Sequence, residues 1–282
     1  MQAEERKYSL DEITPYINWV YFDHAWQMSG AANAASATQG SLRQEEYETL
    51  HRDALDMLHE LTAHYFTHAL FMLVEANGDG DDIVLHMDGH TERLPMLRQQ
   101  HVPDGQPCLC MADFVRPLSS GVHDCIGIFA ATVDEGIERY RHDDPYQALL
   151  AQTLADRLAE ATAERLHEQI RKHDWGYAPD EALSVRQLHR EEFQGIRPAV
   201  GYPSLPDVSL NFELCRLLDF GRIGILLTES GMMQPHGSVS GLMIAHPQAR
   251  YFNIGKIGQD QLDDYARRRH VDSKTIRKYI QQ

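Results

Sequence analysis

The stretch Gly195-Ile196-Arg197-Pro198-Ala199-Val200-Gly201-Tyr202-Pro203 combines a cation, an aromatic ring, two glycines and two prolines within nine residues. Arg197 carries a planar fork of donors that suits a carboxylate. The prolines fix φ on either side of Gly201, where the missing side chain leaves room for a ligand or a second backbone. Tyr202 adds a flat apolar face with a polar tip. Composition alone favours a simpler interpretation, a proline-rich loop between a helix and a strand.

The length of the chain suits one domain around this stretch. At 282 residues with 43% hydrophobic side chains, it can bury a sizeable core without disulfides or metals. Its 26 basic and 42 acidic residues give a formal net charge of −16. Such a field repels nucleic acid and anionic membranes, so we expect neither as a partner. A basic partner, or solubility alone, accounts for the charge.

The four cysteines lack the C-x-x-C spacing of common zinc sites, which predicts free thiols in a reducing compartment. The charged N-terminus has no apolar signal core, and no apolar run approaches the ~20 residues of a membrane span. We therefore expect a cytoplasmic protein. His64 and His68 would share a face of a predicted helix, but the H-E-x-x-H spacing is not formed, and we expect no metal site.

Hydrophobic periodicity predicts strand pairs mixed with helices rather than a regular βαβ alternation. The 29–40 segment is rich in Ala, Gly and Ser and is expected to be irregular. The charges on the long helix after Asp144 are interpreted as a solvated face opposite a packing face. The expected helices are 9–13, 42–71, 145–172, 184–191, 210–218 and 259–282, and the expected strands are 71–76, 83–87, 125–131, 223–228, 239–245 and 251–257.

Several blocks of sequence resemble, in order and spacing, the activation domain of cobalamin-dependent methionine synthase. The likeness covers nearly the whole chain, taken as one domain over 1–282, and is stronger over 146–282 than over 1–145. The blocks include Glu191-Glu192-Phe193-Gln194 with the stretch quoted above, Leu227-Thr228-Glu229-Ser230, Ser238-Val239-Ser240-Gly241, His246-Pro247, Tyr251-Phe252, Asp263-Asp264-Tyr265-Ala266-Arg267-Arg268, Trp175-Gly176-Tyr177-Ala178-Pro179 and Tyr16-Ile17-Asn18-Trp19.

The resemblance implies an α+β fold, with a bent, mainly antiparallel β-sheet flanked by helices. It implies a stand-alone subunit of methionine synthase that binds S-adenosylmethionine and supports reductive methylation of cob(II)alamin on a separate corrinoid-carrying chain, with a flavodoxin-type electron donor. Activity in homocysteine methylation is expected only together with that partner. Two alternatives stay open, a regulatory module that binds S-adenosylmethionine without transferring methyl, and a reactivase of another corrinoid methyltransferase.

The resemblance also implies roles at the predicted ligand site. Arg197 faces the ligand carboxylate and Glu191 its ammonium. Backbone groups of Ala199 and Gly201 read the adenine edge beside Tyr202. Aromatic faces near a sulfonium contribute cation–π energy of roughly 0.5–2 kcal/mol. Those faces are expected from Tyr251 and Phe252.

Asn18 departs from the family pattern, because an Asp often stands there and contacts the ligand. An amide keeps a hydrogen bond but loses the charge, at a cost of ~1.5–3 kcal/mol for one charge-assisted contact. Asp23 is a candidate to compensate. We expect no general base or covalent nucleophile, hence no catalytic residue, because the chemistry implied here requires orientation and proximity.

Overall fold

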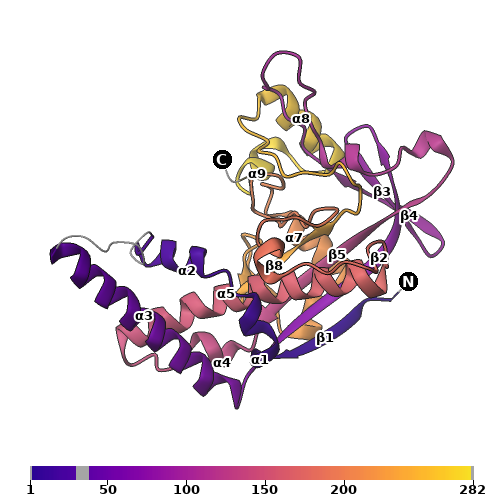
Figure 1. The fold of residues 1–282 in the computed structure, drawn as a ribbon. Helices are drawn as coiled ribbons and strands as arrows, with labels where there is room; N and C mark the ends of the chain where they lie inside the picture. Colours follow the sequence, from indigo (N-terminus) through magenta and orange to yellow (C-terminus); the bar gives the residue numbers. More distant parts are fainter. Residues whose placement is uncertain (1, 30–37, 281–282) are drawn as a thin grey trace.

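The computed structural model describes residues 2–29 and 38–280. Its centre is a six-stranded antiparallel sheet (Figure 1) built around the long strand β2. One edge of β2 pairs with β1 along its first half and with the β3–β4 hairpin along its second half, and the other edge pairs with β5, which then pairs with β8. The strands are β1 (Glu4–Ser9), β2 (Phe66–Asp79), β3 (Asp82–Met87), β4 (His90–Pro95), β5 (Asp124–Val133) and β8 (Ser238–Met243).

The central strands β2 and β5 are buried on both faces of the sheet, which explains why their sequences are nearly continuous apolar runs. Phe71 pairs with Phe129, and both belong to the core on one face. The next residues along the two strands, Met72 and Ile128, pair on the opposite face and belong to a second core. The period-2 geometry of strands therefore divides one apolar run between two cores.

The helix α5 (Pro145–Gln169) packs across β2, β5 and β8 on the first face (Figure 1). Asp144 caps it, since its carboxylate accepts from the N–H groups of Tyr146 and Gln147 at 2.9 and 3.2 Å, and Pro145 occupies the first turn. The other helices of this layer are α1 (Leu10–Ile13), α2 (Trp19–Ala25), α3 (Thr38–Thr62) and α4 (Glu135–Glu138).

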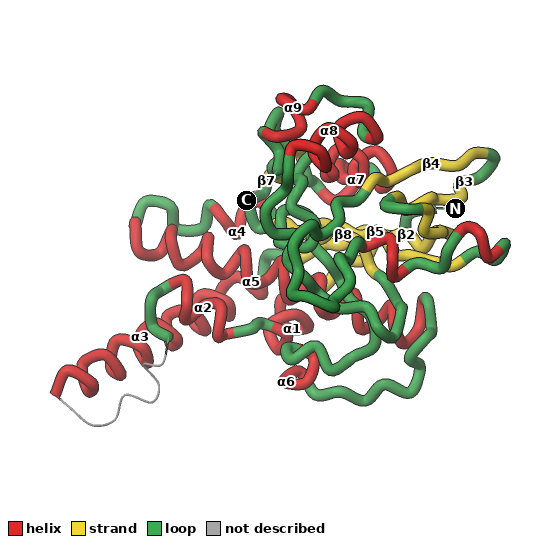
Figure 2. Tube along the Cα trace, turned by 90° about the horizontal axis from the view of Figure 1, so that it is seen from above, coloured by secondary structure: helices red, strands yellow, loops and turns green. Residues whose placement is uncertain are grey.

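The second face carries α7 (Leu210–Leu218). A third, smaller cluster lies under the C-terminal helices α8 (Gln259–Arg268) and α9 (Ser273–Arg277). Long loops connect the elements that follow α5 (Figure 2). Besides α7, these loops contain the short helix α6 (Val185–Leu188) and the two-residue strands β6 (Leu226–Leu227) and β7 (Met233–Gln234) before β8.

The structure confirms the α+β class and most predicted elements, among them 210–218, whose bounds match α7. The 251–257 strand is wrong, because that segment forms no regular element. The predicted helix 42–71 ends at Thr62, since Phe66 already begins β2, and the predicted strand 223–228 reduces to β6. Residues 30–37 of the predicted irregular segment lie outside the described residues, and α3 begins at Thr38.

The histidine pair predicted to share a helix face does not do so. His64 follows the end of α3, whereas His68 lies in β2 and bonds Asp134 at 2.9 Å. The four cysteines are free thiols, as expected. Within residues 2–29 and 38–280, no helix is both long and apolar enough to cross a membrane.

Candidate functional site

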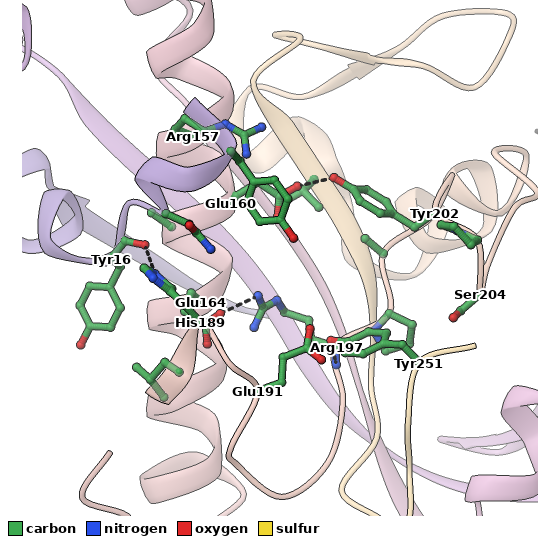
Figure 3. A pocket seen from close by; sticks show the side chains of 18 of the residues that line it. Tyr16, Arg157, Glu160, Glu164, His189, Glu191, Arg197, Tyr202, Ser204 and Tyr251 are labelled. Carbon is green, nitrogen blue, oxygen red and sulfur yellow. Dashed lines mark hydrogen bonds and ion pairs between the residues drawn. The ribbon is translucent and has the colours of Figure 1, made fainter. Parts of the chain in front are cut away.

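A cavity of about 680 Å³ opens between α5, the segment around α2, and the loops that carry Arg197 and Tyr251 (Figure 3). Its walls combine aromatic rings with charged groups. The charged members are Arg157, Glu160, Glu164, Glu191 and Arg197, and the aromatic members are Tyr16, Tyr21, Tyr202, Tyr251 and Phe252.

The loop that carries Arg197 is fixed because it runs along the edge strand β8. Ile196 and Ile244 exchange N–H to C=O bonds of 2.9 and 3.0 Å, and the N–H of Val200 donates to Ser240 at 2.9 Å. Gly241 permits this contact, because a Cβ there would lie 2.9 Å from Cα of Ala199 and closer still to the Pro198 carbonyl oxygen. The stretch that composition described as a loop therefore behaves as an additional edge segment of the sheet.

Arg197 is largely buried and already has protein partners. Its Nη2 lies 3.1 Å from Oε2 of Glu164, and its Nη1 donates to Nδ1 of His167 at 3.2 Å. Its backbone N–H donates to the hydroxyl of Tyr251 at 2.9 Å. Burial opposes the positive charge, but Glu164, together with Tyr251 and Glu160, more than offsets this effect, so the pKa of the guanidinium is raised above its usual value.

Glu191 lies on the cavity wall near Arg197 (Figure 3), and its side chain forms no hydrogen bond or ion pair with any other residue that the structure describes. Its φ of 57° falls in the left-handed region, which is unusual for a residue other than glycine and stores strain. Partial burial raises the pKa of its carboxyl group, with Arg197 acting in the opposite direction and Glu164 in the same direction. Glu191 is therefore a carboxylate that gains from a cation placed beside it.

Tyr202 and Glu160 form a second polar contact across the cavity (Figure 3). The Tyr202 hydroxyl donates to Oε1 of Glu160 at 2.7 Å. Burial and the neighbouring carboxylate both raise the pKa of Tyr202, so the phenol stays protonated. This hydrogen bond holds the Tyr202 ring at the opening of the cavity, where 51% of the residue is exposed.

Asn18 lines the cavity and also caps α2, because its Oδ1 accepts from the N–H of Val20 at 3.2 Å. An Asp caps a helix equally well, so this structural role does not require the amide. Asp23, expected to compensate for the missing charge, does not line the cavity. It lies 2.6 Å from Nε2 of His51 instead.

The structure brings together seven of the eight residues predicted for the site, namely Asn18, Glu191, Arg197, Ala199, Tyr202, Tyr251 and Phe252. Gly201 is the exception, because it lies outside the cavity lining and its N–H donates to the carbonyl of Leu205 at 2.8 Å. Its φ of 89° shows that it serves the turn of the loop.

Sequence reasoning missed the charged residues of α5. Arg157, Glu160 and Glu164 were interpreted as part of a solvated face, but they form a wall of the cavity. Their spacing of three and four residues places them on one face of the helix. Residues on nearly all sides of α5 are buried, which leaves little room for a solvated face. This burial is a property of the structure and was not available as a signal in the sequence.

The fold and this cavity define a class, an α+β domain with one cavity whose wall carries both cationic and anionic side chains. Residues 9–270 match a family model described as vitamin B12 dependent methionine synthase, activation domain. The chain belongs to this family. It is also similar to a solved structure described as the crystal structure of the MetH reactivation domain bound to AdoHcy. The two share 37% sequence identity and a TM-score of 0.90, over 99% of this chain and 89% of that one.

Proposed function

We propose that the cavity binds S-adenosylmethionine, and that the domain thereby supports reductive methylation of cob(II)alamin to reactivate a cobalamin-dependent methionine synthase. The observation that carries the proposal is the convergence of seven predicted ligand residues, from three separate parts of the sequence, on one cavity of about 680 Å³. That volume is typical of small-molecule sites. The similarity to a domain solved with AdoHcy, the demethylated form of the same ligand, gives independent support.

The amino-acid end of the ligand suits the polar wall. A guanidinium has five N–H donors, and Arg197 directs one to Glu164 and one to His167, so further donors remain for a carboxylate. The ligand ammonium is assigned to Glu191 and Asn18. A zwitterion matches this wall better than a simple acid does, because Glu164 already balances the charge of Arg197.

The positive charge of the sulfonium matches the net charge of the cavity wall. Three carboxylates (Glu160, Glu164, Glu191) against two guanidinium groups (Arg157, Arg197) leave one excess negative charge. The zwitterionic end of S-adenosylmethionine is neutral, so its sulfonium supplies the matching positive charge. The rings of Tyr202, Tyr251 and Phe252 add apolar faces on which a sulfonium gains cation–π energy.

The residues of this chain orient the ligand rather than react with it. An electron from a flavodoxin-type donor reduces cob(II)alamin, and the methyl then passes from sulfur to cobalt as the carbon–sulfur bond breaks. The chain holds the sulfonium methyl toward a corrinoid carried by a methionine synthase chain that docks at the cavity mouth. Rate enhancement then comes from proximity and orientation.

Calorimetric titration with S-adenosylmethionine tests the ligand assignment. The variant Arg197→Met/Glu164→Gln removes the charges of the cavity pair together, and we expect it to lose binding. The matched control is Arg268→Met/Asp82→Asn, because Arg268 and Asp82 are an equally buried pair, 14% and 10% exposed, outside the cavity lining. Equal affinity of both variants for the ligand would contradict the assignment.

Methyl transfer is tested separately with cob(II)alamin bound to a methionine synthase fragment that lacks an activation domain. We expect methylcobalamin to form only when this chain, the ligand and a flavodoxin-type reductant are all present. Ligand binding without methyl transfer would instead identify a regulatory module. Transfer only to a different corrinoid protein would identify a reactivase of another methyltransferase.

A further inference from the structure

His167 lies on α5, three residues after Glu164, and is fully buried outside the cavity lining. Both of its ring nitrogens have polar neighbours. Nδ1 lies 3.2 Å from Nη1 of Arg197, and Nε2 lies 3.4 Å from the hydroxyl of Tyr177. The proposed function gives this histidine no role, although it contacts the arginine to which the ligand carboxylate is assigned.

The chemistry of these neighbours determines where the imidazole proton lies. A guanidinium can only donate, so Nδ1 must carry a lone pair to accept from Arg197. The Tyr177 hydroxyl is also placed to donate to the carbonyl oxygen of Gln194 at 3.3 Å. Its single proton is then used, and it accepts from an N–H at Nε2. His167 is therefore the neutral tautomer with its proton on Nε2.

The surroundings keep the ring neutral. The charged and titratable groups around it are Glu164 and Arg171 from its own helical segment, and Tyr177 and Arg197 from the loops packed against it. The guanidinium of Arg171 makes two bonds to Glu181, of 2.9 and 2.7 Å. Burial first, and then Arg171 and Arg197, lower the pKa of His167 well below its usual value.

The ring is also held in place sterically. Phe193 packs edge-to-face against it with centroids 5.1 Å apart, and the Arg171 guanidinium lies over the same Phe193 ring at 4.0 Å. The donors run in one direction, from Arg197 to His167 to Tyr177 to the carbonyl of Gln194. Gln194 lies three residues before Arg197, so the series ties the arginine side chain to the backbone of its own loop.

We propose that His167, as the neutral Nε2–H tautomer, is a positioning residue that fixes the rotation of the Arg197 guanidinium for the ligand carboxylate. The inference rests on the proposed function for the identity of the ligand. His167 and Glu164 each accept a hydrogen bond from one terminal nitrogen of the guanidinium. The orientation of the guanidinium plane is therefore fixed before the ligand binds. Preorganised donors avoid the ordering that free side chains require on binding.

The tautomer is tested on the ligand-free protein by nitrogen-15 NMR of the imidazole groups, with His167 assigned by the signal that His167→Asn lacks. We expect an unprotonated Nδ1 and a protonated Nε2 that do not titrate between about pH 5 and 8, where an ordinary histidine does. A proton on Nδ1, or titration in that window, overturns the proposal.

The positioning role is tested by binding of S-adenosylmethionine to His167→Asn and His167→Leu. Asparagine places an acceptor, Oδ1, at the same distance along the side chain as Nδ1, whereas leucine has no acceptor. We expect His167→Asn to bind within about threefold of the wild type, and His167→Leu to bind about tenfold to a hundredfold more weakly, the range for a lost hydrogen bond to a charged group.

The same two substitutions at His68, which lies on β2 outside the cavity lining, control for the loss of a histidine as such. Equal affinities of His167→Asn and His167→Leu, whether strong or weak, overturn the positioning role, because rescue by the acceptor is its distinguishing mark. If the wild type itself binds no S-adenosylmethionine, the proposed ligand fails, and the NMR result alone decides how His167 is protonated.

Discussion

Oε2 of Glu164 lies 3.1 Å from Nη2 of Arg197, and each of these two side chains keeps only 12% of its surface exposed. The arginine that the sequence offers to a ligand carboxylate is thus already paired inside the protein. A buried pair of this kind is weak evidence for stability, but breaking it leaves an uncompensated buried charge. A substitution of Arg197 alone therefore changes stability as well as ligand binding, and the two effects must be measured separately.

Arg197→Ala alone should lower the free energy of unfolding by about 3–5 kcal/mol, because Glu164 stays behind unpaired. Arg197→Met/Glu164→Gln should recover most of that loss, because neither charge remains. Chemical denaturation followed by circular dichroism measures both. A single variant as stable as the double variant would show that Glu164 is well solvated without its partner.

Asn18→Asp should increase the affinity for S-adenosylmethionine about tenfold or more, since a carboxylate replaces the amide opposite the ligand ammonium. AdoHcy carries the same ammonium and should gain equally. The unfolding free energy should change by less than about 0.5 kcal/mol, because Asp and Asn cap helices similarly well.

Titration calorimetry measures the ligand affinity of Asn18→Asp, and thermal melts measure its stability. Asn18→Ala serves as the control, because it removes the cap of α2 and should cost about 1 kcal/mol of stability. Unchanged ligand affinity in Asn18→Asp would place the ammonium elsewhere in the cavity.

Ligand affinity should rise as pH increases through the raised pKa of Glu191. In the free protein, partial burial lifts this pKa above the usual 4.5, so the carboxyl holds its proton over a wider range. The ligand ammonium favours the ionised form, and binding therefore releases a proton in the window above 4.5. Titration in buffers of different ionisation enthalpy measures that proton, and Glu191→Gln should release none.

The same shift has an opposite consequence for stability. A native pKa above the unfolded value means that the folded state binds the proton more tightly, so this contribution is present at low pH and is lost as pH rises through the raised pKa. The difference in unfolding free energy between the wild type and Glu191→Gln should therefore become less favourable to the wild type over that window. A difference independent of pH would argue against the shift.

Gly241→Ala should destabilise the domain by about 1–3 kcal/mol and weaken ligand binding together, because the new methyl would push the Arg197 loop away from β8. Gly221→Ala is the control, since its nearest neighbour lies at an ordinary 3.4 Å and its backbone needs no positive φ. Denaturation and calorimetry on the same samples check the coupling. Retained affinity in Gly241→Ala would show that the loop holds its shape without β8.

Local patterns predicted much of the fold because they act within a few residues. Asp144-Pro145 begins α5 through backbone capping, and the apolar run after Cys125 forms β5 because both faces of that strand are buried. The 251–257 segment misled the same reasoning. Its alternating residues match a strand, yet no strand among the described residues pairs with it. Tertiary pairing decides whether an extended segment becomes part of a sheet.

For the site, the sequence by itself determined the ingredients, a cation between prolines, a nearby acid and aromatic residues, in the order of a known family. Only the tertiary structure decided how they are used. In the folded chain, Arg197 contacts Glu164 and His167, and Gly201 lies in the turn of the loop. The charged face of α5 forms one wall of the cavity. The physical reason is that packing of α5 on the sheet decides which charges share one desolvated space, and charges interact strongly only there.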